Sequence, residues 1–292
     1  MKITKLFHRH DLKKGIFLVI LAWLCFSTLY MVAKLIGNQT TVPTMLFFRN
    51  VLGLVIIAPF LFKKWRKALE VKNLKIVVGR SLLGLLNLFF IFLAVKKISL
   101  VNTTLLNNSA PLFVPFVLWF WLRVPINHKM WPAIITGFIG IALILQPDKR
   151  IFNLGAAYAL ASGIFLALNL VMMRLTSKSE NLISFLLYFF LIGAVVTIPF
   201  ALADWKIESL FTLIALLSIG LLSCTGQVLL YYGMKQGKAH QLAPFTYSMV
   251  IFSGIYEWLI WGKVPDLIAY IGIILIIASG IWIVIISPPA KG

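Results

Sequence analysis

Apolar segments, each about as long as a membrane-spanning helix, recur along most of this chain. Crossing a hydrocarbon core about 30 Å thick takes roughly 20 residues, because a helix rises about 1.5 Å per residue. Segments of this kind, joined by short connections, lie near residues 15–36, 43–62, 74–95, 100–121, 129–146, 154–175, 181–203, 209–234, 239–261 and 266–286. The pattern predicts an all-α integral membrane protein with ten transmembrane helices.

The first apolar segment follows the basic stretch 1–14, as the apolar region of a signal peptide would. This run is longer than a signal's apolar region and lacks a small-residue cleavage site, and further segments follow it. We therefore expect a retained helix preceded by a cytoplasmic N-terminal segment, 1–14. The polar end of the chain, 287–292, is expected to form a cytoplasmic tail.

The chain matches itself when it is shifted by 140 residues. The matches run from the first predicted helix to the last and include Gly53 with Gly193, Pro59 with Pro199, Asn87 with Gln227, Trp121 with Trp261 and Gly140 with Gly280. Each half holds five helices, an odd number, so the second half must enter the membrane with the opposite orientation. The sequence thus predicts two inverted five-helix repeats, 15–146 and 154–286. Many secondary transporters have this architecture and bind substrate near the bilayer midplane between the halves.

Composition and charge support the membrane interpretation and exclude several classes of function. Hydrophobic residues make up 61% of the 292 residues, and 27 Lys and Arg stand against 8 Asp and Glu, a net charge of +19. The basic residues form short clusters between apolar runs, with no basic arm, so a nucleic-acid partner is not expected. Most of them fall in loops on one side, which predicts that both termini are cytoplasmic.

The sequence carries no signature of an enzyme, a metal site or a cofactor site. There is no HExxH, GxSxG, Walker A or aspartate-rich motif. Cys25 and Cys224 fall inside apolar runs and lack the spacing of a disulfide framework or a metal site. We expect neither catalysis nor a cofactor.

Three sequence stretches carry a resemblance to a known family. FFR at 47–49, FLAVKKIS at 92–99 and YYGMKQGKAH at 231–240, set in ten helices in two halves, resemble the drug/metabolite transporter superfamily of EamA type. The resemblance covers essentially the whole chain. It implies a bacterial inner-membrane permease for small metabolites such as amino acids, with branches that move cofactor-like compounds including S-adenosylmethionine. Where the family pattern usually ends the fourth and ninth helices with Gly-Glu, this chain has Arg123-Val124 and Gly262-Lys263.

Uncharged polar residues interrupt the fourth predicted helix. Asn107 and Asn108 lie on one side of a helix drawn at 100° per residue, and Pro111 removes a hydrogen bond from the carbonyl of Asn107. Polar groups at membrane depth need partners. Two interpretations remain open, in which these side chains either line a substrate cavity or join helices through hydrogen bonds.

Other polar and aromatic positions recur at helical spacing. They could contact substrate, and the alternative is that they pack helices together. The complete set of candidate substrate-binding residues is Asn107, Asn108, Asn87, Gln227, Tyr231, Thr246, Tyr247, Ser253, Trp23, Tyr30 and Asn169.

Charged residues inside the predicted helices are the candidates for gating or coupling. Glu257 is the only carboxylate in the interior of any predicted helix, since Asp266 stands at the first position of the last one, and a charge at the helix centre costs about 2.5 to 3.5 kcal/mol on insertion scales. With Arg49 and Lys34 it falls in the outer third of the membrane, which predicts an outer gate in which an Arg49–Glu257 pair breaks when substrate arrives. The alternatives are a structural ion pair for Glu257 and snorkelling of Glu257 and Lys34 to the interface. Arg80 has no acidic partner visible in the sequence.

The sequence as a whole predicts a secondary transporter that moves a small polar metabolite such as an amino acid by alternating access. One alternative is an uptake or exchange carrier for a cofactor-like metabolite such as S-adenosylmethionine. Another is a membrane scaffold that does not transport, and a third, weaker one is a small receptor or sensor. The expected partners are the metabolite and the lipid bilayer, and the expected state is a monomer or weak homodimer.

Overall fold

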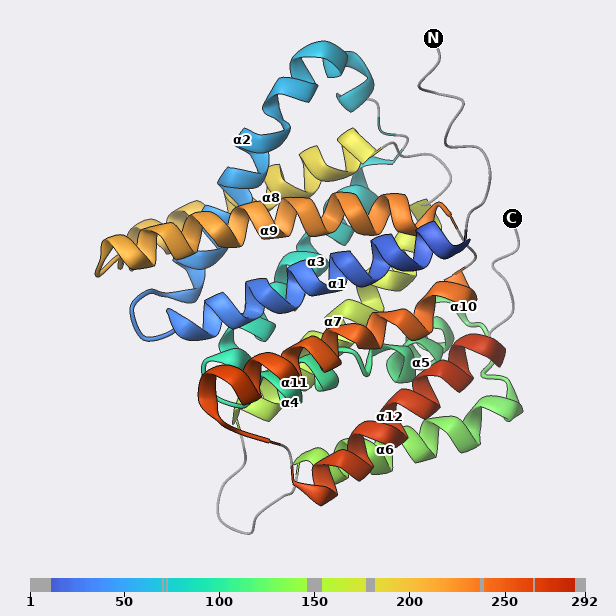
Figure 1. Cartoon of the computed structure of the whole chain (residues 1–292). Coiled ribbons are helices and arrows are strands. Elements are labelled where there is room, and N and C mark those ends of the chain that lie inside the picture. Colours follow the sequence, from blue (N-terminus) through green and yellow to red (C-terminus); the bar gives the residue numbers. More distant parts are fainter. Residues whose placement is uncertain are drawn as a thin grey trace.

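Helices connected by short turns make up the structure, a computed structural model (Figure 1). The residues described are 12–69, 71, 73–145, 154–176, 182–236, 239–264 and 266–286, and they contain no strand. The predicted cytoplasmic tail 287–292 lies outside the described residues, as does the predicted N-terminal segment except for residues 12–14.

The predicted apolar segments correspond closely to the observed helices. The α-helices are α1 (Leu12–Leu35), α2 (Val42–Leu69), α3 (Leu74–Val95), α4 (Leu100–Asn107), α5 (Ala110–Leu122), α6 (Trp131–Leu145), α7 (Leu154–Thr176), α8 (Leu182–Ala203), α9 (Leu210–Met234), α10 (Ala239–Leu242), α11 (Ser248–Trp261) and α12 (Leu267–Ile286). Two 3₁₀ helices complete the described elements, η1 (His128–Met130) and η2 (Ala243–Tyr247). If α4 is counted with α5, and α10 with η2 and α11, the described residues form the ten predicted helical segments.

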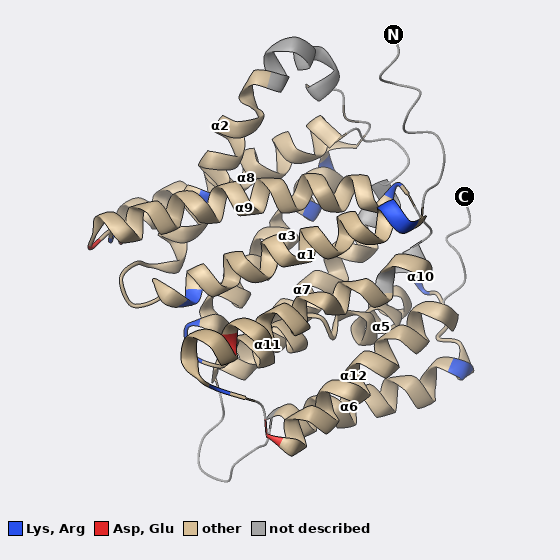
Figure 2. Ribbon diagram, in the orientation of Figure 1, with Lys and Arg blue, Asp and Glu red and all other residues tan. Residues whose placement is uncertain are grey.

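Seven of these helices are long and apolar enough to cross a membrane, judged by length and composition. They are α1, α3, α8, α9 and α12 over their full length, and α2 and α7 over residues 42–59 and 154–172. Charged residues are sparse along the helices and many lie toward helix ends and loops (Figure 2). The described residues are therefore all-helical, as predicted, and seven of the ten predicted helices meet the length and apolarity of a membrane span.

The predicted fourth helix is not continuous. α4 ends at Asn107, the chain turns at Asn108 and Ser109, and α5 restarts at Ala110 with Pro111 in its first turn. Proline explains the break, because it has no N–H and its ring clashes with the carbonyl four residues earlier. Leu105 and Leu106 are as buried as Asn107, so α4 is enclosed on both sides and has no lipid-facing apolar stripe.

The ninth predicted segment is also interrupted. The chain passes from α10 through η2, which carries Pro244 in its first turn, into α11. The residues that follow α11 and α5, Gly262 and Arg123, are both in the left-handed conformation, with φ of 63° and 55°. Two interrupted helices thus occupy corresponding places in the chain.

The helices pack in pairs that join the first part of the chain to the second. The most extensive pairs are α1 with α9, α3 with α7, α2 with α8 and α6 with α12. α4 also packs on α7, α11 on α1, and α4 on α11. In Figure 1, α1 lies alongside α9, and α6 lies alongside α12. The interrupted helices therefore meet each other and a helix from the other part of the chain.

Two glycines allow α2 and α8 to interlock. A Cβ atom built on Gly53 would lie 2.5 Å from the ring of Phe190, and one built on Gly193 would lie 2.6 Å from the amide of Asn50. Contacts this short require something to move. The absence of a side chain at Gly53 and Gly193 is what lets Phe190 and Asn50 each lie against the opposite helix.

A Gly53→Ala substitution is expected to lower the apparent melting temperature by several degrees. The added methyl group would displace the buried ring of Phe190, and overpacking of this kind costs about 1 to 3 kcal/mol. Gly254→Ala is the matched control, since its Cβ would meet only Val101 Cγ2, at an ordinary 3.8 Å, and alanine favours a helix. The measurement is thermal unfolding of the purified proteins. Equal melting temperatures of both variants and the wild type would contradict the interlock.

Candidate functional site

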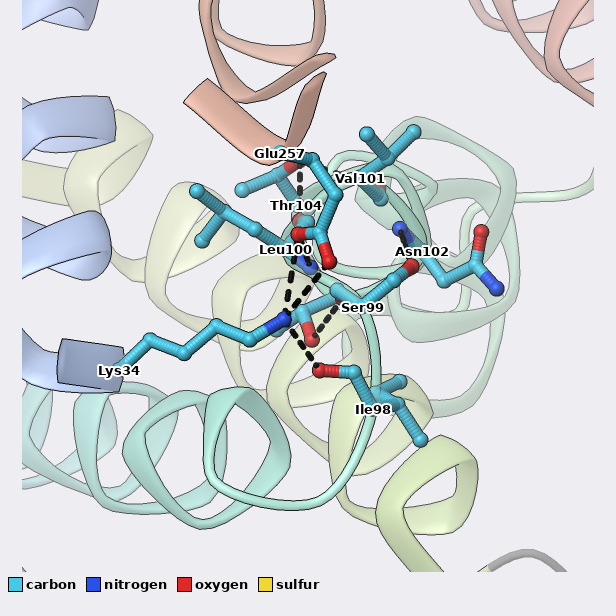
Figure 3. Close-up of polar contacts among 9 residues, drawn as sticks. Lys34, Ile98, Ser99, Leu100, Val101, Asn102, Thr104 and Glu257 are labelled. Carbon is cyan, nitrogen blue, oxygen red and sulfur yellow. Dashed lines mark hydrogen bonds and ion pairs between the residues drawn. The ribbon is translucent and has the colours of Figure 1, made fainter. Parts of the chain in front are cut away.

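An ion pair and two backbone contacts join three segments at one end of the molecule (Figure 3). Glu257 of α11 is 2% exposed, and its carboxylate oxygens lie 2.9 Å and 3.1 Å from Lys34 Nζ. The backbone N–H of Leu100 donates to Glu257 Oε2 over 2.6 Å, and Lys34 Nζ donates to the carbonyl of Ile98 over 3.1 Å. These four residues form what we call the Lys34–Glu257 clasp.

Helix ends place the charges of the clasp favourably. Leu100 opens α4, whose N-cap Ser99 accepts a hydrogen bond from the N–H of Asn102, so Glu257 faces the positive end of a helix dipole. Lys34 lies in the last turn of α1, where a cation is favoured, and its Nζ is 4.7 Å from the ring centroid of Trp261. The clasp therefore ties the end of α1 and the start of α4 to α11.

The clasp differs from the predicted gate. Glu257 is paired with Lys34, and the expected Arg49–Glu257 pair is not formed. Lys34 does not snorkel away from the protein, because its side chain is only 16% exposed and its ammonium group is held by Glu257 and Ile98. Of the alternatives open from the sequence, an ion pair describes Glu257 in this structure.

Hydroxyl groups continue the same interface along α1 and α11. Ser27 Oγ lies 3.0 Å from Ser253 Oγ, and Thr28 Oγ1 lies 2.7 Å from Tyr256 Oη. Both serines are fully buried. The candidate Ser253 thus contacts α1, and Tyr256, which the sequence did not single out, belongs to the same polar seam.

Loops at this end are also linked. Lys96 Nζ donates to the carbonyl of Thr40, Lys206 Nζ to that of Asn38, and Thr212 Oγ1 to Gln39 Oε1, over 3.1, 3.1 and 2.5 Å. Burial lowers the pKa of Lys96, and the nearby charge of Lys206 lowers it further. The connection between α1 and α2 is therefore held both to the end of α3 and to the segment that leads into α9.

Two of the predicted amides converge on one serine of α7. Asn87 Nδ2 donates to the carbonyl of Ser162 over 2.8 Å, and Asn107 Nδ2 donates to its Oγ over 3.0 Å. Asn108 Nδ2 makes a longer contact, 3.6 Å, with Met249 Sδ. These bonds fit the alternative in which amides join helices, while contact with a substrate stays a prediction for all three residues.

The other candidate residues lie on several helices. Tyr30 is buried with its ring edge-on to Phe92, and Tyr247 is buried in a core cluster that also holds residues of α4, α6 and α12. The half-buried candidates are Trp23 on α1, Asn169 on α7, Gln227 and Tyr231 on α9 and Thr246 in η2. The contacts described for this second group do not gather it into one site.

Arg49 lies in a separate buried cluster. Its Nη1 donates to Asn50 Oδ1 over 2.7 Å, and its guanidinium carbon is 5.0 Å and 5.3 Å from the ring centroids of Phe189 and Phe190. Asn50, Phe189 and Phe190 are not among the residues predicted from the sequence. The available signal was the shift of 140 residues, which aligns Arg49 with Phe189 and Asn50 with Phe190.

Metal ligands do not gather anywhere in the described ranges. No group of three or more His, Cys, Asp or Glu side chains there could hold a metal ion. Cys25 and Cys224 are free thiols.

Comparisons with known proteins point to transport. A sequence model described as the EamA-like transporter family matches residues 13–146 and again residues 153–285. The pseudopaline exporter of Pseudomonas aeruginosa is 26% identical over 92% of this chain and 95% of its own length. The S-adenosylmethionine uptake transporter of Rickettsia felis is 26% identical over 86% of each chain. A solved crystal structure of a protein superposes with a TM-score of 0.65, at 17% identity, over 91% of this chain and 95% of that one. The family and these named relatives are transporters, not enzymes.

Proposed function

We propose that this chain, which belongs to the EamA-like transporter family, is a secondary transporter that moves a small polar metabolite such as an amino acid across a bacterial inner membrane. The family match over nearly the whole chain carries the proposal. A multi-pass membrane protein of this family has a small-molecule substrate and is embedded in lipid.

The two halves, 15–146 and 154–286, act in this proposal as inverted repeats. Packing supports this, because the shift of 140 residues relates α1 to α7, α2 to α8, α3 to α9 and α6 to α12. The pair α1 with α9 then corresponds to α7 with α3, and the pairs α2 with α8 and α6 with α12 correspond to themselves. This is the pattern that a twofold relation between the halves would produce, and it would put substrate between them.

Alternating access requires that contacts between the halves break at one end. The clasp is such a contact, since Lys34 and Leu100 belong to the first half and Glu257 to the second. With both termini in the cytoplasm, as the distribution of Lys and Arg predicts, the clasp faces the outside. In our proposal Lys34 and Glu257 close the outer gate in this conformation.

A second candidate function is uptake or exchange of a cofactor-like metabolite such as S-adenosylmethionine. It is favoured by the likeness to the Rickettsia transporter, which spans 86% of both chains. A scaffold without transport is the contrasting class, and it would bind none of these compounds.

The test is a binding screen followed by transport. The full-length protein, purified in detergent, is heated with L-amino acids, nucleosides or S-adenosylmethionine, and the same compounds are offered to proteoliposomes. A ligand at 100 times its Kd adds about 2.7 kcal/mol to the stability of the folded state, so a true substrate raises the melting temperature. We expect at least one compound both to stabilise the protein and to be transported. If none does either, the proposed function is contradicted and the scaffold is favoured.

A further inference from the structure

Arg49 is the largest fully buried side chain among the described residues, with 1% of its surface exposed. It lies seven residues into α2, about 10 Å from the start of the helix at the rise of an α-helix. A charge at such a depth is costly and is usually compensated by a partner of opposite charge. Arg49 is therefore expected to have a partner that compensates its charge.

The described residues supply no carboxylate for Arg49. Glu257 is the only buried carboxylate among them, and its oxygens bind Lys34 Nζ and the N–H of Leu100. What Arg49 meets in this part of the chain is the amide of Asn50 and the faces of two phenylalanine rings. These groups hold the guanidinium in place but leave its charge formally unbalanced.

One edge of the guanidinium is unused in the described contacts. Nη1 of Arg49 donates to Asn50, while Nε is buried without a hydrogen-bond partner. The Nε and Nη2 groups form the side of an arginine that can bind both oxygens of a carboxylate at once. Arg49 is buried against aromatic rings of α8, and apolar surroundings of this kind strengthen a charged hydrogen bond.

The surroundings of Arg49 belong to both proposed halves. Asn50 rests against Gly193 and Phe190 rests against Gly53, so the orientation of the guanidinium is set by the interlock between α2 and α8. Tyr30 of α1 and Cys224 of α9 are close enough to interact electrostatically with it. The cluster thus lies where helices of the two halves meet, and not on the lipid side.

We infer that Arg49 binds the carboxylate of the transported metabolite at the crossing of α2 and α8. This inference rests on the proposed function and specifies its substrate as a small carboxylic acid of the amino-acid type. Arg49 is then a substrate-binding residue instead of the gating residue expected from the sequence. Asn50, Phe189 and Phe190 are positioning residues, because they fix the guanidinium while its Nε–Nη2 edge receives the ligand.

The experiment compares acids with their amides. Compounds that bind in the screen of L-amino acids are measured beside the corresponding amino-acid carboxamides, on the wild-type protein, Arg49→Gln, Arg49→Lys and Arg80→Gln. We expect the wild type to bind the acid at least about 10-fold more tightly than the amide, since a charged hydrogen bond is at stake. Arg49→Gln should weaken binding of the acid by about 10- to 100-fold and leave binding of the amide unchanged. Arg49→Lys should be intermediate, because it keeps the charge and loses the two-pronged geometry.

Arg80→Gln serves as the matched control, because Arg80 on α3 is also a buried arginine against a ring, that of Phe185, and touches the Arg49 cluster only through the stacking of Phe185 on Phe189. It should keep the preference for the acid. The assignment is overturned if the wild type binds acid and amide equally, or if Arg49→Gln weakens binding of both by the same factor. The proposed transport function is unaffected by either result. If Arg49→Gln does not fold, the wild-type comparison and Arg49→Lys decide. A screen without any binder overturns the proposed function and this inference with it.

Discussion

Oxidation of a Ser27→Cys, Ser253→Cys double variant is expected to abolish transport, and a reducing agent is expected to restore it. The two hydroxyl oxygens lie 3.0 Å apart between α1 and α11, and sulfur atoms in their place need to approach by only about 1 Å to form a disulfide. A bond there would fix the first half of the chain to the second beside the clasp. If the outer gate opens by separation of α1 from α11, the oxidised protein cannot complete a cycle.

The measurement is substrate uptake by proteoliposomes before and after reduction, in a background where Cys25 and Cys224 are replaced by alanine. The single variants Ser27→Cys and Ser253→Cys are the controls, since neither can form the bond and both should transport with or without oxidant. Undiminished transport by the fully oxidised double variant would show that α1 and α11 stay together throughout the cycle. The gate would then have to be sought elsewhere.

Helix positions could be predicted from the sequence because membrane spans leave a strong local signal. The length and apolarity of a span are properties of one segment, so the predicted segments 74–95 and 181–203 differ little from α3 and α8 as observed. The break in the fourth segment has a local cause too, since Pro111 cannot continue α4. The apolar pattern nevertheless predicts one helix over 100–121, because apolar residues continue on both sides of the break.

Partners across helices could not be predicted in the same way. Whether Glu257 meets Lys34 or Arg49 depends on the rotation and depth at which α1, α2 and α11 pack, and a single sequence does not carry these values. The same limit applies to Asn87 and Asn107, which were identified as polar residues in need of partners. Their common partner, Ser162 on α7, emerges only from the packing of α3 and α4 against that helix.

The internal match carries some of this missing information. A twofold relation would bring equivalent positions of the two halves together at the helices that pair with themselves. In agreement, Arg49 lies over Phe189, its equivalent under the shift, and Gly53 and Gly193 are used in the same way on α2 and α8. Residues of repeated segments that are polar in one half and aromatic in the other are thus the ones to inspect in related sequences.

Glu257→Ala is expected to destabilise the protein strongly as well as to impair transport. The substitution leaves Lys34 Nζ and the N–H of Leu100 without their acceptor, and removal of one partner from a buried ion pair costs about 3 to 5 kcal/mol. Because the Lys34 side chain keeps 16% exposure and its bond to Ile98, we expect the lower part of that range. The apparent melting temperature should fall by more than about 5 °C.

A double-mutant cycle separates the ion pair from other effects of the substitution. Lys34→Met alone leaves a buried carboxylate with only the N–H of Leu100, and should also destabilise. The double variant Lys34→Met, Glu257→Gln carries neither charge, and its glutamine oxygen can still accept from Leu100, so it should melt above both Lys34→Met and Glu257→Ala. Thermal unfolding of the wild type, Lys34→Met, Glu257→Gln and the double variant gives the coupling energy between the two side chains. Purely additive losses would mean that Lys34 and Glu257 do not hold the halves together, because a clasp that contributes nothing as a pair cannot serve as the gate.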